Sequence, residues 1–316
     1  MKLSLALLTT TLITILQTSL VASAPSQAVA DSLSRLPTPI SRVPIEQIAV
    51  DTALEKRSSA TAKTAILLPA YIYPSSWTSP PAWQPIYDAA AAYPGVTFHV
   101  IINPNSGPGG ASPDSEYQTA ITTLKRFSNV VLLGYVHTSW GTRSSDAVYA
   151  DIKTYVGWKS QGYGMQGIFY DEAPSQATST LYNYMANITC YAKEQILATG
   201  IGLPTIYFNP GTVADVRYYT LADYISVFED TYTSYLTNEP TFAPGTELTM
   251  SNSNFMIHSM NGGWTQAQMS SFISSLSNGD GVGSVFLTSN SDPSNPYGTF
   301  GADWTEFVAG VDALRH

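Results

Sequence analysis

The chain has 316 residues, and its 14 Lys and Arg against 23 Asp and Glu give a formal net charge of −9. Residues 58–316 hold nine of the basic and 19 of the acidic side chains, so they carry the excess. This balance disfavours nucleic acid or an anionic membrane as the partner and suits a neutral or cationic ligand. Cys190 is the single cysteine. An intrachain disulfide and a zinc site built on thiolates are therefore excluded.

Residues 1–24 have the pattern of a secretory signal peptide. Lys2 precedes an uncharged stretch that runs to about Val21, and residues 22–24, Ala-Ser-Ala, have the small-x-small form that signal peptidase recognises. A membrane anchor is the alternative interpretation of this stretch. We expect a secreted, extracellular protein, with association to a cell wall as a further option, and no membrane contact once the signal is removed.

Residues 25–57 have the composition of a pro-segment or linker. They are rich in Pro, Ser and Ala, contain no aromatic residue and end in the dibasic pair Lys56-Arg57. The pair resembles a kexin-type processing site of a fungal secretory pathway, and an exposed charged pair in a linker is the alternative. We expect one domain over residues 58–316, which is long enough to bury a core without disulfides.

Apolar, β-rich runs alternate with helical patterns from Lys63 onward. Most of these runs are nearly continuous in apolar residues, as parallel strands buried on both faces require. Eight pairs of this kind favour a single (β/α)8 TIM-type barrel over an open doubly wound sheet, and no Gly-rich dinucleotide fingerprint follows the first run. The predicted strands are 65–72, 96–102, 130–136, 167–170, 204–208, 224–228, 255–258 and 282–287.

The segments between these runs show apolar residues at helical spacing. The third such segment contains Leu181, Tyr184, Met185 and Ile188. Cys190 belongs to the same pattern, and the simplest interpretation is a core residue. The sequon at Asn187 lies on the opposite side of this helix and predicts a glycosylation site.

Polar and aromatic residues follow the carboxyl ends of the predicted strands, where TIM-barrel active sites lie. Carboxylates follow only the fourth and sixth strands, so they are expected to face each other across the mouth of the barrel. Because side chains alternate along a strand, Asp171 and Glu172 should not both point inward. The residues at the strand ends are Tyr71, Tyr73, Asn103, His137, Asp171, Glu172, Asn209, Glu229, Asp230, His258, Thr288 and Ser289.

Paired carboxylates suit glycosidic bond hydrolysis, in which one acid protonates the leaving oxygen and a carboxylate attacks the sugar or activates water. Acidic residues that cap helices or pair with cations are the structural alternative. His137 and His258 do not stand at the spacing of a metal motif, so we expect no metal and no cofactor. The absence of a Gly-x-Ser-x-Gly elbow argues against an esterase of the α/β-hydrolase type.

Several segments together resemble the spherulin-4, or spherulation-specific, family of fungi and bacteria. These are residues 68–74 (LPAYIYP), 102–107 (INPNSG), 134–137 (GYVH), 167–172 (GIFYDE) and 209–211 (NPG). The family is similar to glycoside hydrolase family 135, a (β/α)8 family that cleaves α-1,4-linked N-acetylgalactosamine within the fungal exopolysaccharide galactosaminogalactan. The resemblance implies an endo-acting glycosidase whose acids fall on Asp171, Glu172 and Glu229.

The predicted protein is a monomeric glycoside hydrolase with a polysaccharide substrate. Asp171 is expected to act as nucleophile or as its close electrostatic partner, Glu229 as general acid/base, and Glu172 as the residue that orients one of them. A catalytically silent carbohydrate-binding or cell-wall protein on the same barrel and a metal-dependent deacetylase are the alternatives. The residues expected to hold the sugar are Tyr71, Tyr73, Asn103, His137, Tyr170, Asn209, Asp230 and Trp264.

Overall fold

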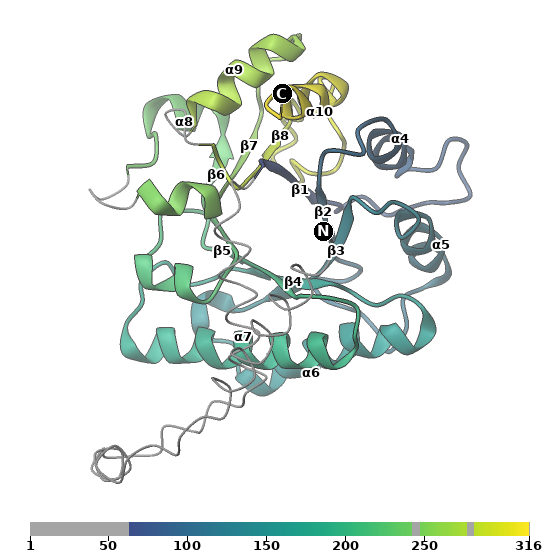
Figure 1. The fold of residues 1–316 in the computed structure, drawn as a ribbon, viewed down its shortest axis with the longest axis vertical. Coiled ribbons are helices and arrows are strands. Elements are labelled where there is room, and N and C mark those ends of the chain that lie inside the picture. The colour runs from purple at the N-terminus through teal and green to yellow at the C-terminus, as the bar shows by residue number, and fades with distance from the viewer. Residues whose placement is uncertain (1–62, 242–246, 277–280, 316) are drawn as a thin grey trace, which may run out of the picture. The chain divides into compact units, whose positions relative to one another are not determined.

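A computed structural model describes residues 63–241, 247–276 and 281–315 (Figure 1). The predicted signal peptide and pro-segment lie outside these residues. Eight parallel strands close into a barrel in chain order, which confirms the predicted (β/α)8 architecture. The strands are β1 (Ala65–Pro69), β2 (Phe98–Ile102), β3 (Val130–His137), β4 (Gly167–Asp171), β5 (Thr205–Asn209), β6 (Tyr224–Thr231), β7 (Ser253–His258) and β8 (Ser284–Leu287).

An α-helix follows every strand except β5, which is followed by the 3-10 helix η3 (Val216–Thr220). The other 3-10 helices are η1 (Ser139–Gly141), η2 (Trp158–Gln161) and η4 (Glu247–Asn252). The α-helices are α4 (Gln84–Ala92), α5 (Ser115–Leu124), α6 (Ser145–Gly157), α7 (Ser179–Ala198), α8 (Tyr232–Thr237), α9 (Gln266–Ser275) and α10 (Trp304–Ala313).

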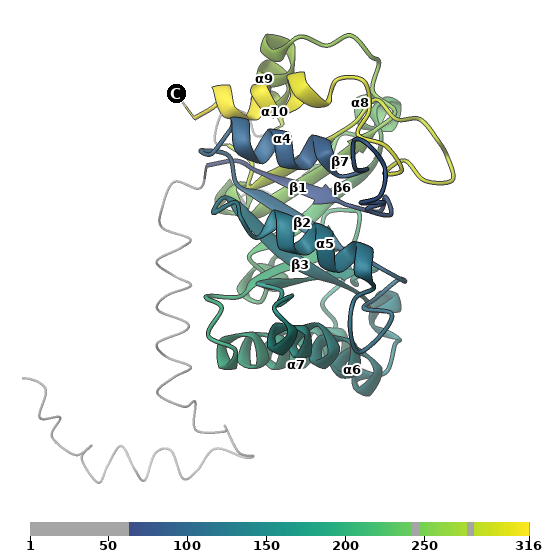
Figure 2. The same ribbon diagram turned by 90° about the vertical axis from the view of Figure 1, so that its right-hand side faces the viewer.

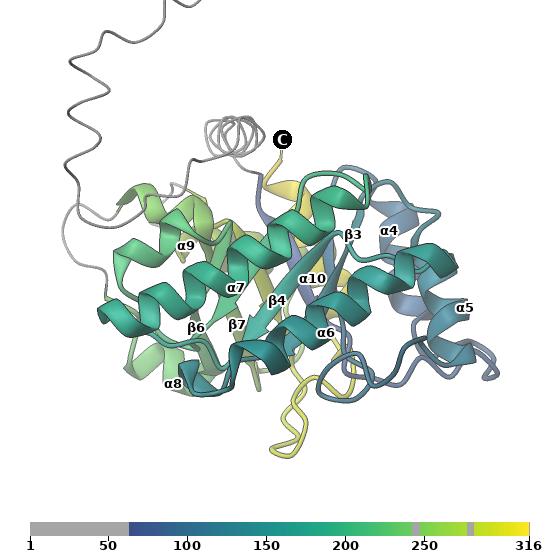
Figure 3. The same cartoon turned by 90° about the horizontal axis from the view of Figure 1, so that it is seen from below.

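The helices surround the strands, and the first and last of them complete the ring. Helices α4 and α10 lie side by side (Figure 2), and the Trp304 indole N–H donates to the Pro85 carbonyl oxygen between them at 3.2 Å. Helices α6 and α7 pack together across the outside of β3 and β4 (Figure 3). Among the described residues, no helix has the length and apolar character needed to cross a bilayer.

Local sequence signals explain where the helices begin. The carboxylate of Asp114 accepts from the backbone N–H groups of the first turn of α5, and Thr178 caps α7 in the same manner. Thr265 and Gln268 form a reciprocal capping box at α9. These side chains satisfy amide groups that have no partner inside the helix.

Glycine allows one helix to approach the sheet closely. The ring of Tyr155 on α6 occupies the space where a side chain at Gly134 of β3 would lie, with ring atoms 2.6 Å from an ideal Cβ position. The Tyr155 hydroxyl then donates to the Ile102 carbonyl oxygen at 2.8 Å. These contacts hold the Tyr155 ring of α6 against the outer face of the barrel at β2 and β3.

The barrel interior contains a chain of buried polar side chains. The Tyr207 hydroxyl donates to Ser284 Oγ at 3.1 Å, and Ser284 in turn donates to Asn254 Oδ1 at 2.8 Å. Asn254 Nδ2 donates to Ser226 Oγ at 2.9 Å. The Tyr207 hydroxyl also contacts His99 Nδ1 at 2.5 Å. The floor beneath the barrel mouth is therefore a hydrogen-bonded layer.

The prediction that Cys190 is a core residue is wrong. Cys190 is exposed, and its thiol contacts Glu194 Oε1 one turn along the helix at 3.5 Å. The buried stripe of α7 runs through Met185, Ile188, Thr189, Ala192 and Ile196, and Cys190 falls outside it. Asn187 of the sequon is also exposed on this helix.

Candidate active site

Asp171 ends β4 with its side chain directed into the barrel mouth. Strand pairing places it in register with His137 of β3 and Asn209 of β5. Residues in register on neighbouring parallel strands share one face. Two residues earlier on the same face, the rings of Tyr135 and Phe169 lie together in the barrel interior. The strand-end positions of three consecutive strands therefore converge at the mouth.

Glu229 reaches the same mouth because β6 contains a bulge. Ser226 faces the interior, where it bonds to Asn254, and regular alternation would direct the residue three positions later outward. The register of β6 on β7 shifts between Ser226 and Phe228. The extra residue turns Glu229 inward, while Phe228 packs edge-on against Tyr235 of α8. Bulges of this type often re-aim a side chain beside an active site.

One amide group joins the two carboxylates. Asn209 Nδ2 donates to Asp171 Oδ1 at 2.8 Å and to Glu229 Oε2 at 2.6 Å. Asn209 Oδ1 accepts from the Gly211 backbone N–H at 3.1 Å, which fixes the orientation of the amide. Two oxygens that share one donor nitrogen are about 5 Å apart or closer.

Two tyrosines complete the hydrogen bonding of the acid pair. The Tyr135 hydroxyl donates to Asp171 Oδ2, and the Tyr297 hydroxyl donates to Glu229 Oε1, each at 2.6 Å. The ring of Tyr71 lies between them, with edge-on centroid distances of 5.9 Å to Tyr135 and 5.7 Å to Tyr297. All four carboxylate oxygens thus accept from a neutral donor.

The environment of Glu229 raises the pKa of its carboxyl group. Burial raises the pKa of the Glu229 carboxyl above its ordinary value, and the charge of Asp171 raises it further. Hydrogen bonds from Tyr297 and Asn209 oppose this shift without cancelling it. A raised pKa on one of two neighbouring carboxyl groups is a feature of a general acid.

Glu172 leaves the strand immediately after Asp171. Its backbone is left-handed, with φ of 51°, and its carbonyl oxygen accepts from the Trp140 backbone N–H at 2.6 Å and from Thr138 Oγ1 at 2.8 Å. The charge of its half-buried carboxylate bears on the Tyr135 hydroxyl. Asp171 therefore contacts the bridging amide of Asn209. Glu172 lies beside the pair of Asp171 and Glu229 and is not bonded to that amide.

Other predicted sugar-binding residues lie around the mouth and hold loops. His137 Nδ1 lies 3.3 Å from the Ser106 carbonyl oxygen, and Asn103 Oδ1 accepts from the Gly107 N–H at 2.9 Å. Asp230 is exposed and accepts from the Thr231 backbone N–H at 2.6 Å.

The prediction that Tyr170 holds the sugar is wrong. Its side chain is fully buried on the outside of β4, and its hydroxyl donates to the Ile188 carbonyl oxygen of α7 at 2.8 Å. The physical reason is strand alternation, which directs Tyr170 away from the side that Asp171 faces. Tyr73 contacts Trp77 and Tyr117 at the rim, and Trp264 packs against Tyr232 and Phe272. None of these contacts joins the acid pair.

Sequence reasoning missed Tyr135 and Tyr297. Tyr135 stands two residues before the end of β3, and Tyr297 lies in the long loop between β8 and α10. The inward position of Tyr135 follows from its two-residue spacing from His137. No local signal in the sequence identifies Tyr297.

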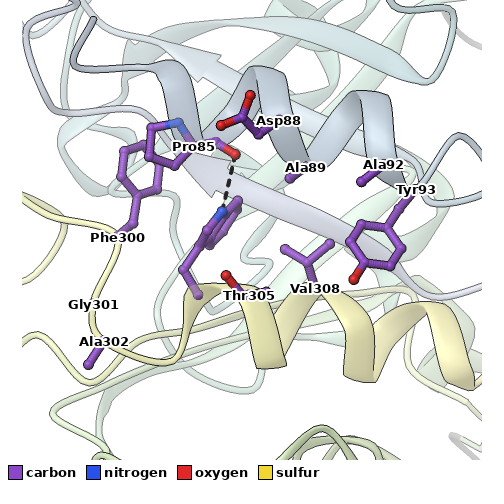
Figure 4. A pocket seen from close by; sticks show the side chains of 11 residues that line it. Pro85, Asp88, Ala89, Ala92, Tyr93, Phe300, Gly301, Ala302, Thr305 and Val308 are labelled. Carbon is purple, nitrogen blue, oxygen red and sulfur yellow. Dashed lines mark hydrogen bonds between the residues drawn. The ribbon is translucent and has the colours of Figure 1, made fainter. Parts of the chain in front are cut away.

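A separate cavity lies outside the barrel between α4 and α10. It has a volume of about 470 Å³, and Tyr93, Phe300 and Trp304 are among its lining residues (Figure 4). Neither Asp171 nor Glu229 lines it. In the described part of the chain, no group of three or more His, Cys, Asp or Glu is arranged to hold a metal ion.

Comparison with known proteins identifies the family. The model of the spherulation-specific family 4 matches residues 65–311, which is nearly the whole described barrel. The chain belongs to this family. The match confirms the resemblance seen in the sequence motifs.

Two proteins are similar to this chain over most of its length. Spherulin-4 of Physarum polycephalum is 30% identical over 256 residues, which cover 79% of this chain and 70% of that protein. The sequence of this chain is also 30% identical to that of Aspergillus clavatus Sph3, and its fold matches the crystal structure of Sph3 in complex with GalNAc with a TM-score of 0.68. That match covers 79% of this chain and 98% of the Sph3 chain.

Proposed function

We propose that this protein is a secreted glycoside hydrolase that cleaves within an exopolysaccharide containing α-1,4-linked N-acetylgalactosamine or galactosamine. The observation that carries the proposal is the pairing of Asp171 with Glu229 through Asn209 at the barrel mouth. The similarity to Sph3, which was crystallised with GalNAc, supports this sugar class.

Glu229 is the general acid in this proposal. The raised pKa of its carboxyl group suits proton donation, and this carboxyl lies at the mouth, where a glycosidic oxygen would enter. Proton transfer to that oxygen accompanies cleavage of the bond from the anomeric carbon to the leaving group. The ionised Glu229 then takes a proton from the water that completes hydrolysis.

Asp171 faces the developing positive charge on the sugar. Hydrogen bonds from Tyr135 and Asn209 hold both of its oxygens, so the carboxylate needs little reorganisation as the charge develops. It acts either as the nucleophile or as the close electrostatic partner of the oxocarbenium-like centre. Glu172 adds negative charge nearby and is proposed to orient this group.

The surrounding aromatic and amide groups suit a neutral or cationic sugar. Tyr71 lies between the two hydroxyl donors, and among the described residues no hydrogen-bond partner is found for its own hydroxyl. His137 and Asn103 border the same opening. The acidic composition of the domain is compatible with the amino groups of a partly deacetylated hexosamine polymer.

The extracellular location is part of the proposal and rests on the sequence pattern of residues 1–24. A polysaccharide outside the cell or in the wall would be the substrate met there. We propose that the protein acts as a monomer.

A reducing-end assay tests the proposed function. The purified chain beginning near Ser58 is incubated with a GalNAc polymer, a galactosamine polymer, chitin and a galactan, with Glu229→Gln as the control. We expect new reducing ends from the galactosamine-type polymers and almost none from the variant. Polymer binding that persists in both proteins without new reducing ends would replace the proposal with a silent carbohydrate-binding function. Activity that a chelator abolishes would indicate a metal hydrolase instead.

A further inference from the structure

Large aromatic side chains are exposed on the rim that surrounds the candidate active site. In the described part of the chain these are Tyr73, Trp77 and Trp140, with exposed fractions of 44%, 67% and 61%. All three follow the carboxyl ends of β1 or β3, at the same end of the barrel as Asp171. An exposed indole leaves much apolar area in water, so its position beside a site suggests a ligand that covers it.

Trp140 occupies an unusual backbone conformation. Ser139, Trp140 and Gly141 are consecutive left-handed residues, with φ of 49°, 53° and 83°. A bulky residue rarely adopts this conformation, and such strain persists only where the surrounding structure imposes it. A left-handed turn with an exposed Trp at its centre therefore requires a local explanation.

Contacts on both sides impose the turn. The Trp140 backbone N–H donates to the Glu172 carbonyl oxygen at 2.6 Å, and the Gly141 N–H donates to the Thr138 carbonyl oxygen at 3.1 Å. Leu181 of α7 closely packs against Gly141, 2.5 Å from an ideal Cβ position there. The turn is thus held by the segment that follows β4 and by α7.

The same contacts connect the turn to the acid pair. The Thr138 N–H donates to the Asp171 carbonyl oxygen at 2.9 Å, so the residue that begins the turn is bonded to the residue that ends β4. Arg143 secures the far side, because its guanidinium donates to the His137 carbonyl oxygen and pairs with Asp151 at 2.7 Å. Trp140 is therefore displayed on a fixed support next to Asp171 and Glu172.

We infer that the Trp140 indole is a stacking platform for a sugar ring of the substrate beyond the ring held at Asp171 and Glu229. The inference rests on the proposed function and specifies how the site distinguishes a long polymer from a short oligosaccharide. The apolar C–H face of a pyranose ring covers the indole and removes its apolar area from water. The rigid turn lowers the entropic cost of this contact because the platform is already in place.

The informative substitution removes the indole and keeps the turn. Asn tolerates the left-handed conformation better than most residues, so Trp140→Asn preserves the backbone and its bonds to Glu172. Trp140→Phe retains an aromatic face and tests rescue. Leu203→Asn is the matched control, because Leu203 is 37% exposed and precedes β5 at the opposite end of the barrel.

The experiment compares kcat/KM on a GalNAc disaccharide, on an octasaccharide and on the polymer, together with polymer affinity in gel retardation. Trp140→Asn is expected to lower polymer kcat/KM by about tenfold through KM, with a much smaller loss on the disaccharide. Trp140→Phe recovers most of this loss, and Leu203→Asn matches the wild type. Equal polymer affinity and KM in wild type and Trp140→Asn would overturn the inference alone. A wild type that neither binds nor cleaves any of these sugars would overturn the proposed function as well.

Discussion

Asp171 and Glu229 accept hydrogen bonds from the same nitrogen atom, Nδ2 of Asn209, at 2.8 Å and 2.6 Å. This arrangement fixes both the separation and the relative orientation of the two acids. Tyr135 and Tyr297 hold the outer oxygens from opposite sides. The site therefore has a rigid geometry, from which the stereochemistry and the pH dependence of the reaction can be predicted.

The short separation predicts retention of anomeric configuration. Retaining glycosidases place their carboxyl groups about 5 Å apart, whereas inverting enzymes leave about 6.5 to 9.5 Å for a water molecule. The nearest oxygens of Asp171 and Glu229 share one donor nitrogen and lie about 5 Å apart or closer, which favours the first class. Proton NMR of the earliest product from a GalNAc oligosaccharide is expected to show the α-anomer. An initial β-anomer would assign inversion and rule out Asp171 as nucleophile.

Tyr297→Phe is expected to move the alkaline limb of the pH profile to higher pH. The Tyr297 hydrogen bond lowers the pKa of Glu229, so its removal raises that pKa further and keeps the general acid protonated over a wider range. The measurement is kcat/KM against pH. Tyr235→Phe is the control, because the hydroxyl of Tyr235 on α8 donates instead to Glu239, which follows that helix. A limb that moves to lower pH, or that moves equally in both variants, would contradict this assignment of Glu229.

Gly134→Ala is expected to destabilise the fold by about 1–3 kcal/mol, because the new methyl group overlaps the Tyr155 ring that packs against β3. Urea unfolding followed by circular dichroism measures the change. Gly157→Ala provides the comparison, since Gly157 has helical φ and ψ with open space around its Cβ position. That variant should gain about 0.4–1 kcal/mol. Similar behaviour of the two variants would show that Tyr155 does not depend on the absence of a side chain at position 134.

The sequence predicts the barrel well because its signal is repeated eight times. Each buried strand requires a continuous apolar run, and errors of a few residues at the ends leave the count unchanged. The predicted first strand extends to Ile72, for example, whereas β1 ends at Pro69. The sequence also predicts that Asp171, Asn209 and Glu229 lie together, because all three follow predicted strands and the carboxyl ends of all strands meet at one mouth of the barrel.

The remaining features of the site depend on interactions that the sequence does not display. The inward direction of Glu229 results from a bulge in β6, and a bulge is defined by its pairing with β7. Tyr297 joins the acid pair from a loop whose path depends on tertiary contacts. Tyr170 precedes Asp171 in the sequence, but strand alternation directs it to the outside of β4, away from the mouth. Proximity in sequence to a candidate catalytic residue is therefore a poor guide where side chains alternate.

The most direct test compares Asp171→Asn, Glu229→Gln and Glu172→Gln by the initial rate of reducing-end release from a GalNAc polymer, with circular dichroism as the control for folding. In the first two variants kcat is expected to fall about 10²–10⁴-fold, because each removes a member of the acid pair joined by Asn209. Glu172→Gln should retain far more activity, since its side chain lies beside that pair. Wild-type turnover in either of the first two variants, or a loss confined to Glu172→Gln, would contradict the proposed catalytic pair.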